Sequence, residues 1–372
     1  MATVYKSLLN SDIVSTRTLL HEAIPITGSI VSGTYIEGAA ASQVEVNVKN
    51  YAHGMFQSVY DYPYLSSSAN HILDITAGYA ASSGLSSSTN IQNSKKINVY
   101  SQMAQVLMGY DYTGSIQPFD EDMDLVAGGT KLNECYFLNF SRLLVKDEIK
   151  KGSFKLDLGV TNAYNAPFSN VLTVHDISAS NSFRTSHNGE VGILEAIDKI
   201  GTCLQTQNVK CGLIFYQAGV VVLSSSIFQS TTHGGLLATG AGNTVQLRYW
   251  YDGSSWQHQL PKAAFTGSSV SGSADGVRNR IYNIHFNNTT ELNSTVYFCR
   301  VNHNDYNYSS NPTYLKNSKI RVKNTRSDSP TSYITTVGLY SADNELLAVA
   351  KLSEPLKKDP TTELTLRVRL DY

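Results

Sequence analysis

Charge of either sign is scarce in this 372-residue chain. Charged residues make up 16% of the sequence, below the roughly 25% of an average soluble domain. The 29 basic residues nearly balance the 30 acidic ones, which leaves a net charge of −1. Proteins that bind nucleic acid need a basic field, so the composition argues against a nucleic-acid partner.

Cysteine is also sparse, with four residues in the whole chain. Cys135, Cys203, Cys211 and Cys299 form no C-x-x-C pair and show no metal-ligand spacing. We therefore predict free and mostly buried thiols, the usual state in a reducing cytoplasm.

Long hydrophobic runs are missing. Every apolar run falls far short of the roughly 20 residues that span a membrane as a helix. The first residues, Met1-Ala-Thr-Val, lack the charged start and apolar core of a secretory signal. We expect no membrane association, and we expect synthesis and folding in a cytoplasm.

The usual catalytic signatures are missing as well. The sequence has no Gly-x-Ser-x-Gly elbow and no Gly-Lys-Ser/Thr phosphate loop. Gly240-Ala-Gly242 lacks the third glycine of a dinucleotide site, and Pro25 stands where a His21-Glu22 zinc motif needs its second histidine. We predict no catalytic residue, no cofactor and no metal. Carboxylates brought together only by folding would escape this search.

One acidic stretch has the spacing with which a calcium loop begins. Asp120, Asp122 and Asp124 alternate with other residues, but an EF-hand also needs Gly at 125 and Glu at 131. The sequence has Leu125 and Lys131 there. We interpret the stretch as a solvated acidic loop.

What the sequence does contain is strand patterning, clearest in residues 331–372. Two β-prone runs flank the turn Ser341–Glu345, which predicts a hairpin. From Glu363 to Tyr372 apolar and polar residues alternate, as in a half-buried strand. Further strands are predicted at residues 28–35, 44–48, 135–140, 154–160, 211–223 (a hairpin), 245–251, 281–286, 295–301 and 319–323.

A few short helices are expected beside these strands. Apolar spacing and cap residues predict helices at residues 15–23, 55–60, 97–108 and 193–200. The Gly/Ser-rich stretches 80–93 and 270–278 are predicted loops. The fold class is therefore mainly β, with antiparallel β-sandwich or barrel-like domains and a few short helices. We expect domains at residues 1–165 and 166–301, and a strand and hairpin module at residues 302–372 that could belong to the second domain.

Aromatic residues are plentiful, with 23 tyrosines. A low-charge surface rich in Tyr and Asn is typical of protein–protein contacts, although a β-rich protein with many polar turns has a similar composition. Such rings could also stack on sugars or bases. The candidate interaction surface comprises Tyr249, Trp250, Tyr251, Tyr306, Tyr308, Tyr314 and Tyr340. The basic residues available for nucleic acid lie among acidic ones; they are Arg278, Arg280, Arg321, Lys323, Arg326, Arg367 and Arg369.

Several phrases resemble virion structural proteins of tailed bacteriophages. The hairpin TTVGLYSADNELLAVAKLS is similar to hairpins of tail-fibre attachment regions and of tail or baseplate proteins. Four further phrases resemble structural proteins of marine, T4-like phages: VYDYPYLSSSANHILDITAGY, KKINVYSQMAQVLMGYD, FSRLLVKDEIKKGSF and YNYSSNPTY. The resemblance spans most of the chain, and such proteins have no catalytic motif to compare.

The resemblance implies a non-enzymatic structural subunit of a phage particle, in the tail, baseplate or neck rather than the capsid shell. Its partners would be other virion proteins and further copies of itself in a symmetric ring. Strands and loops with little charge suit this role, because they can bury surface without desolvating charges. Two alternatives remain: a capsid-decorating protein and a glycan-binding protein of the virion surface.

Overall fold

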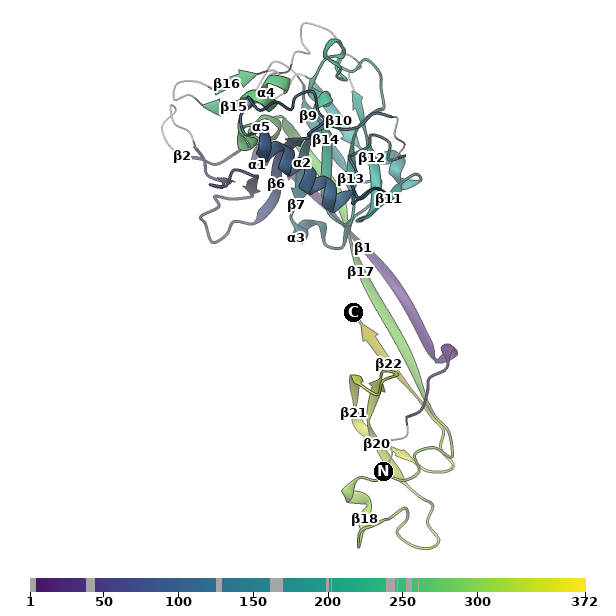
Figure 1. Cartoon of the computed structure of the whole chain (residues 1–372). Coiled ribbons are helices and arrows are strands. Elements are labelled where there is room, and N and C mark those ends of the chain that lie inside the picture. The colour runs from purple at the N-terminus through teal and green to yellow at the C-terminus, as the bar shows by residue number, and fades with distance from the viewer. Residues whose placement is uncertain are drawn as a thin grey trace. The chain divides into compact units, whose positions relative to one another are not determined.

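A computed structural model shows that the chain divides into two compact units (Figure 1). Unit 1 comprises Met1–Leu19 and Glu291–Tyr372, and unit 2 comprises Leu20–Thr290. The structure describes residues 5–37, 44–124, 129–160, 170–198, 201, 203–238, 245, 247–251, 256–259 and 261–372, without the side chains of 248–251 and 256–259. In this part of the chain, no helix has the length and apolar character needed to cross a membrane.

The fold is mainly antiparallel β with a few short helices, as the sequence predicts. Two strands have residues in both units: β1 (Ile13–Thr27) and β17 (Ile281–Val301). The other strands of unit 2 are β2 (Ile36–Glu37), β3 (Val44–Glu45), β4 (Val48–Asn50), β5 (Gln57–Tyr60), β6 (His71–Tyr79), β7 (Glu134–Phe140), β8 (Glu148–Ile149), β9 (Lys155–Gly159), β10 (Val171–His175), β11 (Arg184–Ser186), β12 (Gly189–Asp198), β13 (Val209–Phe215), β14 (Val220–Ser224), β15 (Leu247–Tyr251) and β16 (Trp256–Gln259).

The helices of unit 2 are short apart from one of 15 residues, α2. They are α1 (Gly28–Val31), α2 (Asn93–Leu107), α3 (Arg142–Val145), α4 (Pro261–Gly267) and α5 (Val270–Arg278), with the 3-10 turns η2 (Ile177–Ser180), η3 (Ser225–Phe228) and η4 (Thr231–His233). Unit 1 contains β18 (Leu315–Lys316), β19 (Lys319–Ile320), β20 (Ser332–Tyr340), β21 (Leu346–Lys358), β22 (Leu364–Asp371), η1 (Asn10–Asp12) and η5 (Pro312–Tyr314).

A large sheet forms the body of unit 2, with the strand order β17-β9-β10-β12-β13-β14-β7-β6-β5-β4. It consists of two antiparallel meanders, β4 to β7 and β9 to β14, joined side by side where β7 pairs with β14. Residues Ile281–His285 of β17 pair with β9 at the far end of the second meander.

Both faces of this sheet are buried at its centre. In β7, Tyr136 and Leu138 enter one hydrophobic cluster, while Cys135 and Phe137 enter a second cluster on the opposite face. The first cluster includes residues of α4 and α5, and the second includes residues of α2. Because successive side chains of a strand point to opposite faces, every residue from Cys135 to Leu138 is fully buried.

Helix α2 lies very close to strand β6 (Figure 1). A Cβ atom added at Gly78 of β6 would lie 2.5 Å from the carbonyl oxygen of Lys96 and 2.9 Å from the backbone nitrogen of Tyr100. Glycine permits this contact because it has no side chain. The helix ends where the sequence predicts: Gly109, with a φ of +80°, donates its N–H to the carbonyl of Ala104.

The boundary expected between residues 165 and 166 lies outside the described residues. The strands on either side, β9 and β10, pair directly over five residue pairs, from Val171↔Gly159 to His175↔Lys155. Residues from both of the first two expected domains therefore build the large sheet of unit 2, and residues 302–372 belong to unit 1 together with the N-terminal segment.

Several predicted elements are confirmed. The helix at 97–108 is α2, and the strands at 135–140 and 154–160 are β7 and β9. The hairpin at 211–223 is β13–β14, turning through Tyr216–Gly219, and the two C-terminal features are the hairpin β20–β21 and strand β22.

Three predicted helices are wrong, because strand pairing overrides local helical spacing. Residues 15–23 lie within β1, which includes Pro25, and Gln57–Tyr60 form β5 rather than part of a helix. Residues 193–198 belong to β12, which pairs with β10 on one side and β13 on the other. The last two residues of that predicted helix lie outside the described part.

Two other predictions are also corrected. The stretch 270–278, expected to be a loop, is helix α5: the Ser269 side chain accepts the Gly272 N–H at 3.0 Å and caps it. Val270, Ala274 and Val277 are buried at helical spacing. The strand expected at 28–35 is the short helix α1 followed by a turn.

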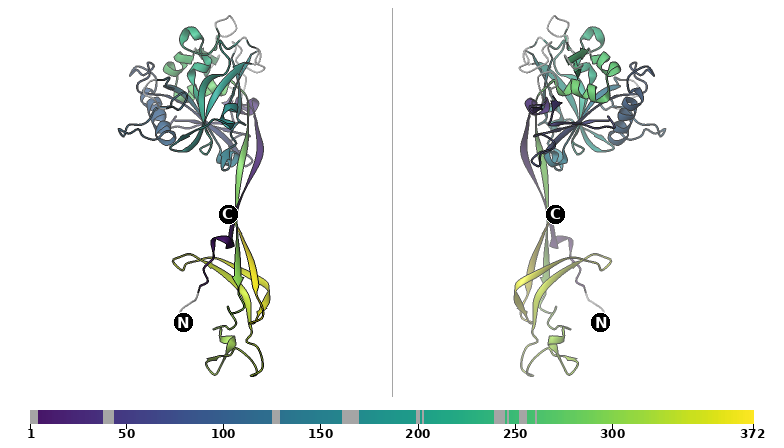
Figure 2. Two further views of the ribbon diagram at one scale, coloured as in Figure 1. Left: turned by 90° about the vertical axis from the view of Figure 1, so that its right-hand side faces the viewer. Right: turned by 90° about the vertical axis from the view of Figure 1, so that its left-hand side faces the viewer.

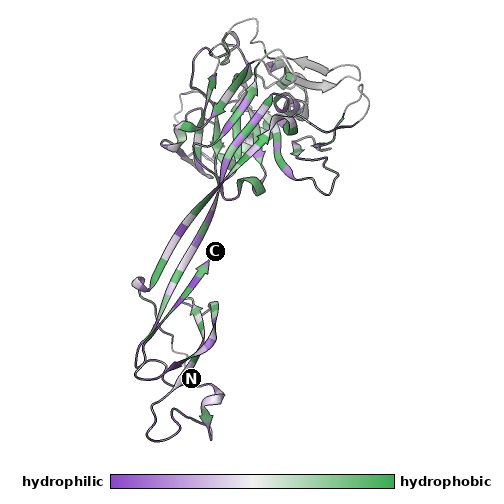
Figure 3. Ribbon diagram, turned by 180° about the vertical axis from the view of Figure 1, so that it is seen from behind, coloured by the Kyte–Doolittle hydropathy of each residue, from purple (hydrophilic) through white to green (hydrophobic). Residues whose placement is uncertain are grey.

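Unit 1 is built from strands that bury few side chains. Residues Ser294–Val301 of β17 pair with β22 in antiparallel register, and the C-terminus marked in Figure 2 follows β22. Strands β20 and β21 form a two-stranded sheet, as do β18 and β19. Apolar and polar residues alternate along these strands, visible as green and purple bands in Figure 3.

We predict that Gly78→Ala destabilises unit 2, because the methyl group meets the backbone of α2, which cannot move without repacking the core. The expected loss is about 1–3 kcal/mol, typical of overpacking, measured as a lower urea midpoint at an unchanged denaturant slope. The matched control is Gly84→Ala, since a Cβ at Gly84 meets no atom within 4 Å. Equal midpoints for the two variants would show that Gly78 is not a packing constraint.

Candidate functional site

The main asymmetry of the molecule is the distribution of its hydrophobic core. Both clusters of buried apolar side chains lie within residues 26–286, in unit 2. Among the described apolar residues of unit 1, the most buried are Val296, Val301 and Val368, each 7–9% exposed. The strands of unit 1 therefore have almost no core of their own.

An exposed apolar patch lies on one face of the hairpin β20–β21. The register pairs Gly338 with Val349 and Tyr340 with Leu346, and an irregularity between Leu339 and Tyr340 brings these partners onto one face. A Cβ at Gly338 would lie 2.9 Å from the Tyr340 ring and 3.3 Å from the Leu346 side chain. The Tyr5 ring packs on Tyr340 with 4.6 Å between centroids. We call these residues, Tyr5, Gly338, Tyr340, Leu346 and Val349, the hairpin patch.

The side chains of the hairpin patch are far from buried. Tyr340 is 43% exposed, Leu346 53% and Val349 51%. The opposite face of the hairpin is half-buried and includes Val337, Leu339, Ala348 and Ala350. Within the described residues, β20 and β21 pair with each other and with no other strand. A two-stranded hairpin with solvated edges is marginally stable alone, and its free backbone groups can pair with another chain.

The tyrosines predicted as an interaction surface fall into both units. Tyr249, Trp250 and Tyr251 are in β15 of unit 2, which pairs with β16. The structure describes only the backbone of these three residues. Tyr306, Tyr308 and Tyr340 of unit 1 are exposed at 47%, 60% and 43%. Tyr314 is half-buried, and its hydroxyl accepts the Tyr333 backbone N–H at 3.1 Å.

Sequence reasoning missed four members of the hairpin patch, Gly338 among them, and one exposed ring. Tyr5, Leu346 and Val349 join Tyr340, and Tyr333 lies beside Tyr314 with 51% exposure. Simple alternation places Leu346 and Val349 on opposite faces of a strand. They share a face here because the register shifts next to them, and no sequence signal marks that shift.

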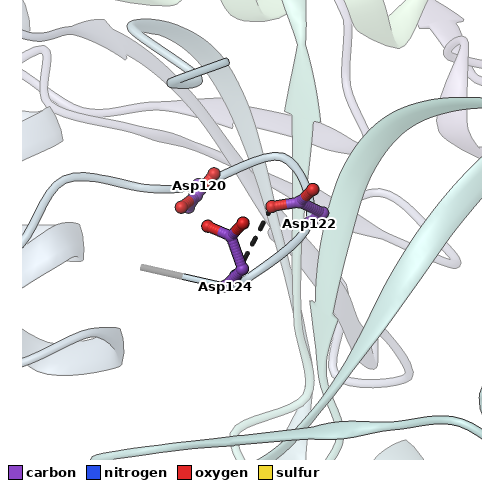
Figure 4. A group of neighbouring side chains, drawn as sticks. All are labelled: Asp120, Asp122 and Asp124. Atoms are coloured by element: carbon purple, nitrogen blue, oxygen red, sulfur yellow. Dashed lines mark hydrogen bonds between the residues drawn. The ribbon is translucent and has the colours of Figure 1, made fainter. Parts of the chain in front are cut away.

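The acidic stretch brings its three carboxylates together (Figure 4), with oxygens of Asp120, Asp122 and Asp124 within 4.8 Å of one another. Lysines hold two of these groups: Lys131 lies 2.7 Å from Asp120, and Lys210 lies 3.2 Å from Asp122. The hydrogen bond from Lys210 lowers the pKa of Asp122. Because the lysine ammonium groups already balance much of the negative charge, we assign this cluster no ligand.

Ser58, Asp74 and His71 form a polar group on β5 and β6. The Ser58 hydroxyl donates to Asp74 Oδ1 at 2.5 Å, and His71 Nε2 lies 2.8 Å from the same oxygen. A nucleophilic serine needs a base placed to take its proton. Ser58 is only 2% exposed, so its hydroxyl has little room to meet a substrate, and we interpret the group as structural.

Buried charged groups in unit 2 have structural partners. The Arg278 guanidinium, fully buried, donates to Gln57 at 3.0 Å, to Asp275 at 2.9 Å and to the Val31 carbonyl at 3.0 Å, and it also pairs with Glu45. It thereby ties α5 to β5 and to the C-terminal end of α1. Arg280 is also buried, so neither arginine belongs to an exposed basic surface.

Lys96 of α2 is another fully buried cation. Its ammonium group donates to the carbonyls of Ile91 at 2.9 Å and Ser268 at 2.6 Å, and to that of Phe265. It thereby connects α2 to α4 and the segment before α5. Burial lowers the pKa of Lys96 to about 8, because desolvation disfavours the charged form.

No protein-family model, curated protein or solved structure matches this chain. The role of the hairpin patch is therefore inferred from its own residues and geometry.

We predict that Lys96 makes the stability of unit 2 rise with pH above neutrality. An unfolded lysine has a pKa near 10.4, whereas that of the folded Lys96 is about 8. Between these values the unfolded chain binds more protons, so the free energy of unfolding increases, by about 2 kcal/mol from about pH 8 to about pH 10. Urea titrations across this range measure it.

Lys96→Met should reduce this pH-dependent rise, and Lys95→Met should preserve it, because Lys95 is a half-buried neighbour that donates to the His53 carbonyl. The buried thiols of Cys135 and Cys211 and the buried hydroxyls of Tyr100, Tyr136 and Tyr216 have pKa values raised by burial, so they lower the total free energy of unfolding as pH rises and offset the contribution of Lys96. They are present in all three proteins and cancel in the comparison. Parallel pH profiles for the wild type and Lys96→Met would refute the assignment.

Proposed function

We propose that this chain is a non-enzymatic structural subunit of a tailed-phage particle, built into the tail, baseplate or neck through protein–protein contacts. The observation that carries the proposal is the hairpin patch on a unit with almost no core of its own. The resemblance of the hairpin and of four other phrases to tailed-phage virion proteins supports a phage particle as the assembly.

Unit 1 gains most of its missing burial by assembly. Fully burying an exposed Leu or Val side chain contributes about 1.5–3 kcal/mol, and Leu346 and Val349, at 53% and 51% exposure, have about half of that still to gain. Tyr340 adds a large ring with a polar tip that suits an interface. None of the hairpin-patch side chains is charged, so a partner can cover them without desolvating an ion. The partners are other virion proteins and further copies of this chain in a ring.

An enzyme is the weaker candidate. In the described residues, Ser58 of the polar group on β5 and β6 is buried, and Lys96 and Arg278 are bound to structural partners. A virion subunit needs stable surfaces rather than a reactive group, and the hairpin patch provides such a surface.

The location in the particle is tested by cryo-electron microscopy of purified particles that contain this chain. Density for the chain in a ring of the tail, baseplate or neck is the expected result. Density that follows the lattice of the shell would instead assign capsid decoration. Its absence from the particle would overturn the virion proposal.

We predict that Leu346→Asp and Val349→Asp abolish incorporation into particles while unit 2 stays folded. Each aspartate puts a charge into the contact, where burial without a counter-charge is costly. Incorporation is measured by quantitative mass spectrometry of purified particles, and folding by the urea midpoint of the free protein. The control is Leu65→Asp, since Leu65 in unit 2 is 87% exposed. Normal incorporation of both patch variants would exclude the hairpin patch as the contact.

A further inference from the structure

Unit 1 contains a groove away from the hairpin patch. Its volume is about 480 Å³, and its walls come from the segment before β18 and from the base of the hairpin β20–β21. The lining residues are Ser309, Asn311, Thr313, Tyr314, Tyr333, Thr335 and Pro355. We call this feature the tyrosine groove.

The lining of the tyrosine groove consists of hydroxyl, amide and aromatic groups together with the ring of Pro355. It contains no aliphatic side chain of the Leu, Ile or Val type and no charged side chain. An apolar ligand would desolvate the hydroxyl and amide groups without replacing their hydrogen bonds, which is costly. Tyr together with Ser and Asn suits adaptable recognition, because the rings give rigid contact area and the small residues give hydrogen bonds.

The groups of the groove are positioned but retain hydrogen-bonding capacity. Asn311 Oδ1 accepts the Thr313 N–H at 3.1 Å, and its NH2 has no acceptor among the described residues. Tyr314 accepts the Tyr333 N–H at 3.1 Å and keeps its own O–H for a ligand. Tyr333 is 51% exposed, so its ring is accessible.

A basic segment continues directly from one wall of the groove. Residues 315–327 contain no acidic residue and carry Lys316, Lys319, Arg321, Lys323 and Arg326, all exposed. Arg321 donates its backbone N–H to the Tyr314 carbonyl at 2.6 Å, which places the segment against the groove. Among the described residues, none of the five forms an ion pair, and the side chains of Arg321 and Lys323 donate to backbone carbonyls.

We propose that the tyrosine groove and the basic segment together form a binding site for an acidic saccharide. The sugar ring lies against Tyr333 and bonds with the hydroxyl and amide groups of the groove. The carboxylate or sulfate of the saccharide lies on the basic segment. Aromatic stacking provides contact area, and the cations select an anionic ligand. The site lies apart from the hairpin patch, so the inference goes beyond the proposed assembly role and does not depend on it.

The test is isothermal titration of the purified full chain with a sulfated, uronic-acid-containing tetrasaccharide and with maltotetraose, a neutral sugar of the same length. The acidic sugar should bind measurably and the neutral sugar at least about tenfold more weakly, a factor that corresponds to one charged contact or so. Binding of the acidic sugar should weaken as salt increases, because the contacts with the basic segment are solvent-exposed.

Two variants and two matched controls locate the site. Tyr333→Ala removes the accessible ring, and Lys316→Glu with Lys319→Glu reverses charge at side chains that make no described hydrogen bond or ion pair. Each should weaken binding of the acidic sugar about tenfold or more, the usual cost of losing a stacking ring or a charged contact. Tyr340→Ala removes a ring of the hairpin patch and Lys351→Glu reverses an exposed charge on β21, and both should bind normally.

Three results would overturn the inference. The first is no binding of the acidic sugar at millimolar concentration. The second is equal binding of the two sugars. The third is loss of binding in the charge-reversal variant with no effect of Tyr333→Ala, which would show attraction of any polyanion without use of the groove. Particle incorporation of Tyr333→Ala separates this site from the assembly role, because that variant should still assemble.

Discussion

The pairing of β7 with β14 holds the two meanders of unit 2 together. Five residue pairs, from Val220↔Asn139 to Ser224↔Cys135, join strands that are far apart in sequence. Both strands are buried on both faces, so alternate residues of each contribute to the two hydrophobic clusters. Breaking this pairing would expose both clusters at once. Strand β6, which carries Gly78, pairs with β7. The contact between Gly78 and α2, and with it the burial of Lys96, therefore depends on this central part of the sheet.

The two units differ in how far their charged and apolar side chains are satisfied within the unit. Unit 2 satisfies its buried cations internally, as Lys96 does with three carbonyls and Arg278 with two acidic groups and an amide. Unit 1 satisfies one buried cation, Lys358, in the same way, but it leaves apolar side chains, polar groove groups and five cations facing solvent. Exposed apolar and polar groups of this kind can be covered by a partner or a ligand. Both proposals therefore concern unit 1.

The sequence predicted elements wherever one local pattern dominated. The alternation in β22 and the helical spacing of α2 before Gly109 each had one interpretation. Ile193, Ala196 and Ile197 fit helical spacing, yet pairing on both sides makes them part of β12, and pairing partners cannot be read from one segment. Ser269 and the spacing of Val270, Ala274 and Val277 did signal α5, but the glycines around them favoured a loop. The hairpin patch was out of reach, since it depends on a register shift between Leu339 and Tyr340.

The discontinuity of unit 1 has a consequence for the order of events during synthesis. Its strands come from Met1–Leu19 and Glu291–Tyr372, so all of unit 2 leaves the ribosome between its two parts. Strand β20 begins 42 residues after Thr290, so at about 5–20 residues per second the completed unit 2 has a few seconds in which to collapse before β20 exists. The hairpin patch is thus translated after the segment that carries both cores. Under the proposed assembly role, a nascent chain whose unit 2 is still incomplete does not yet carry the hairpin contact.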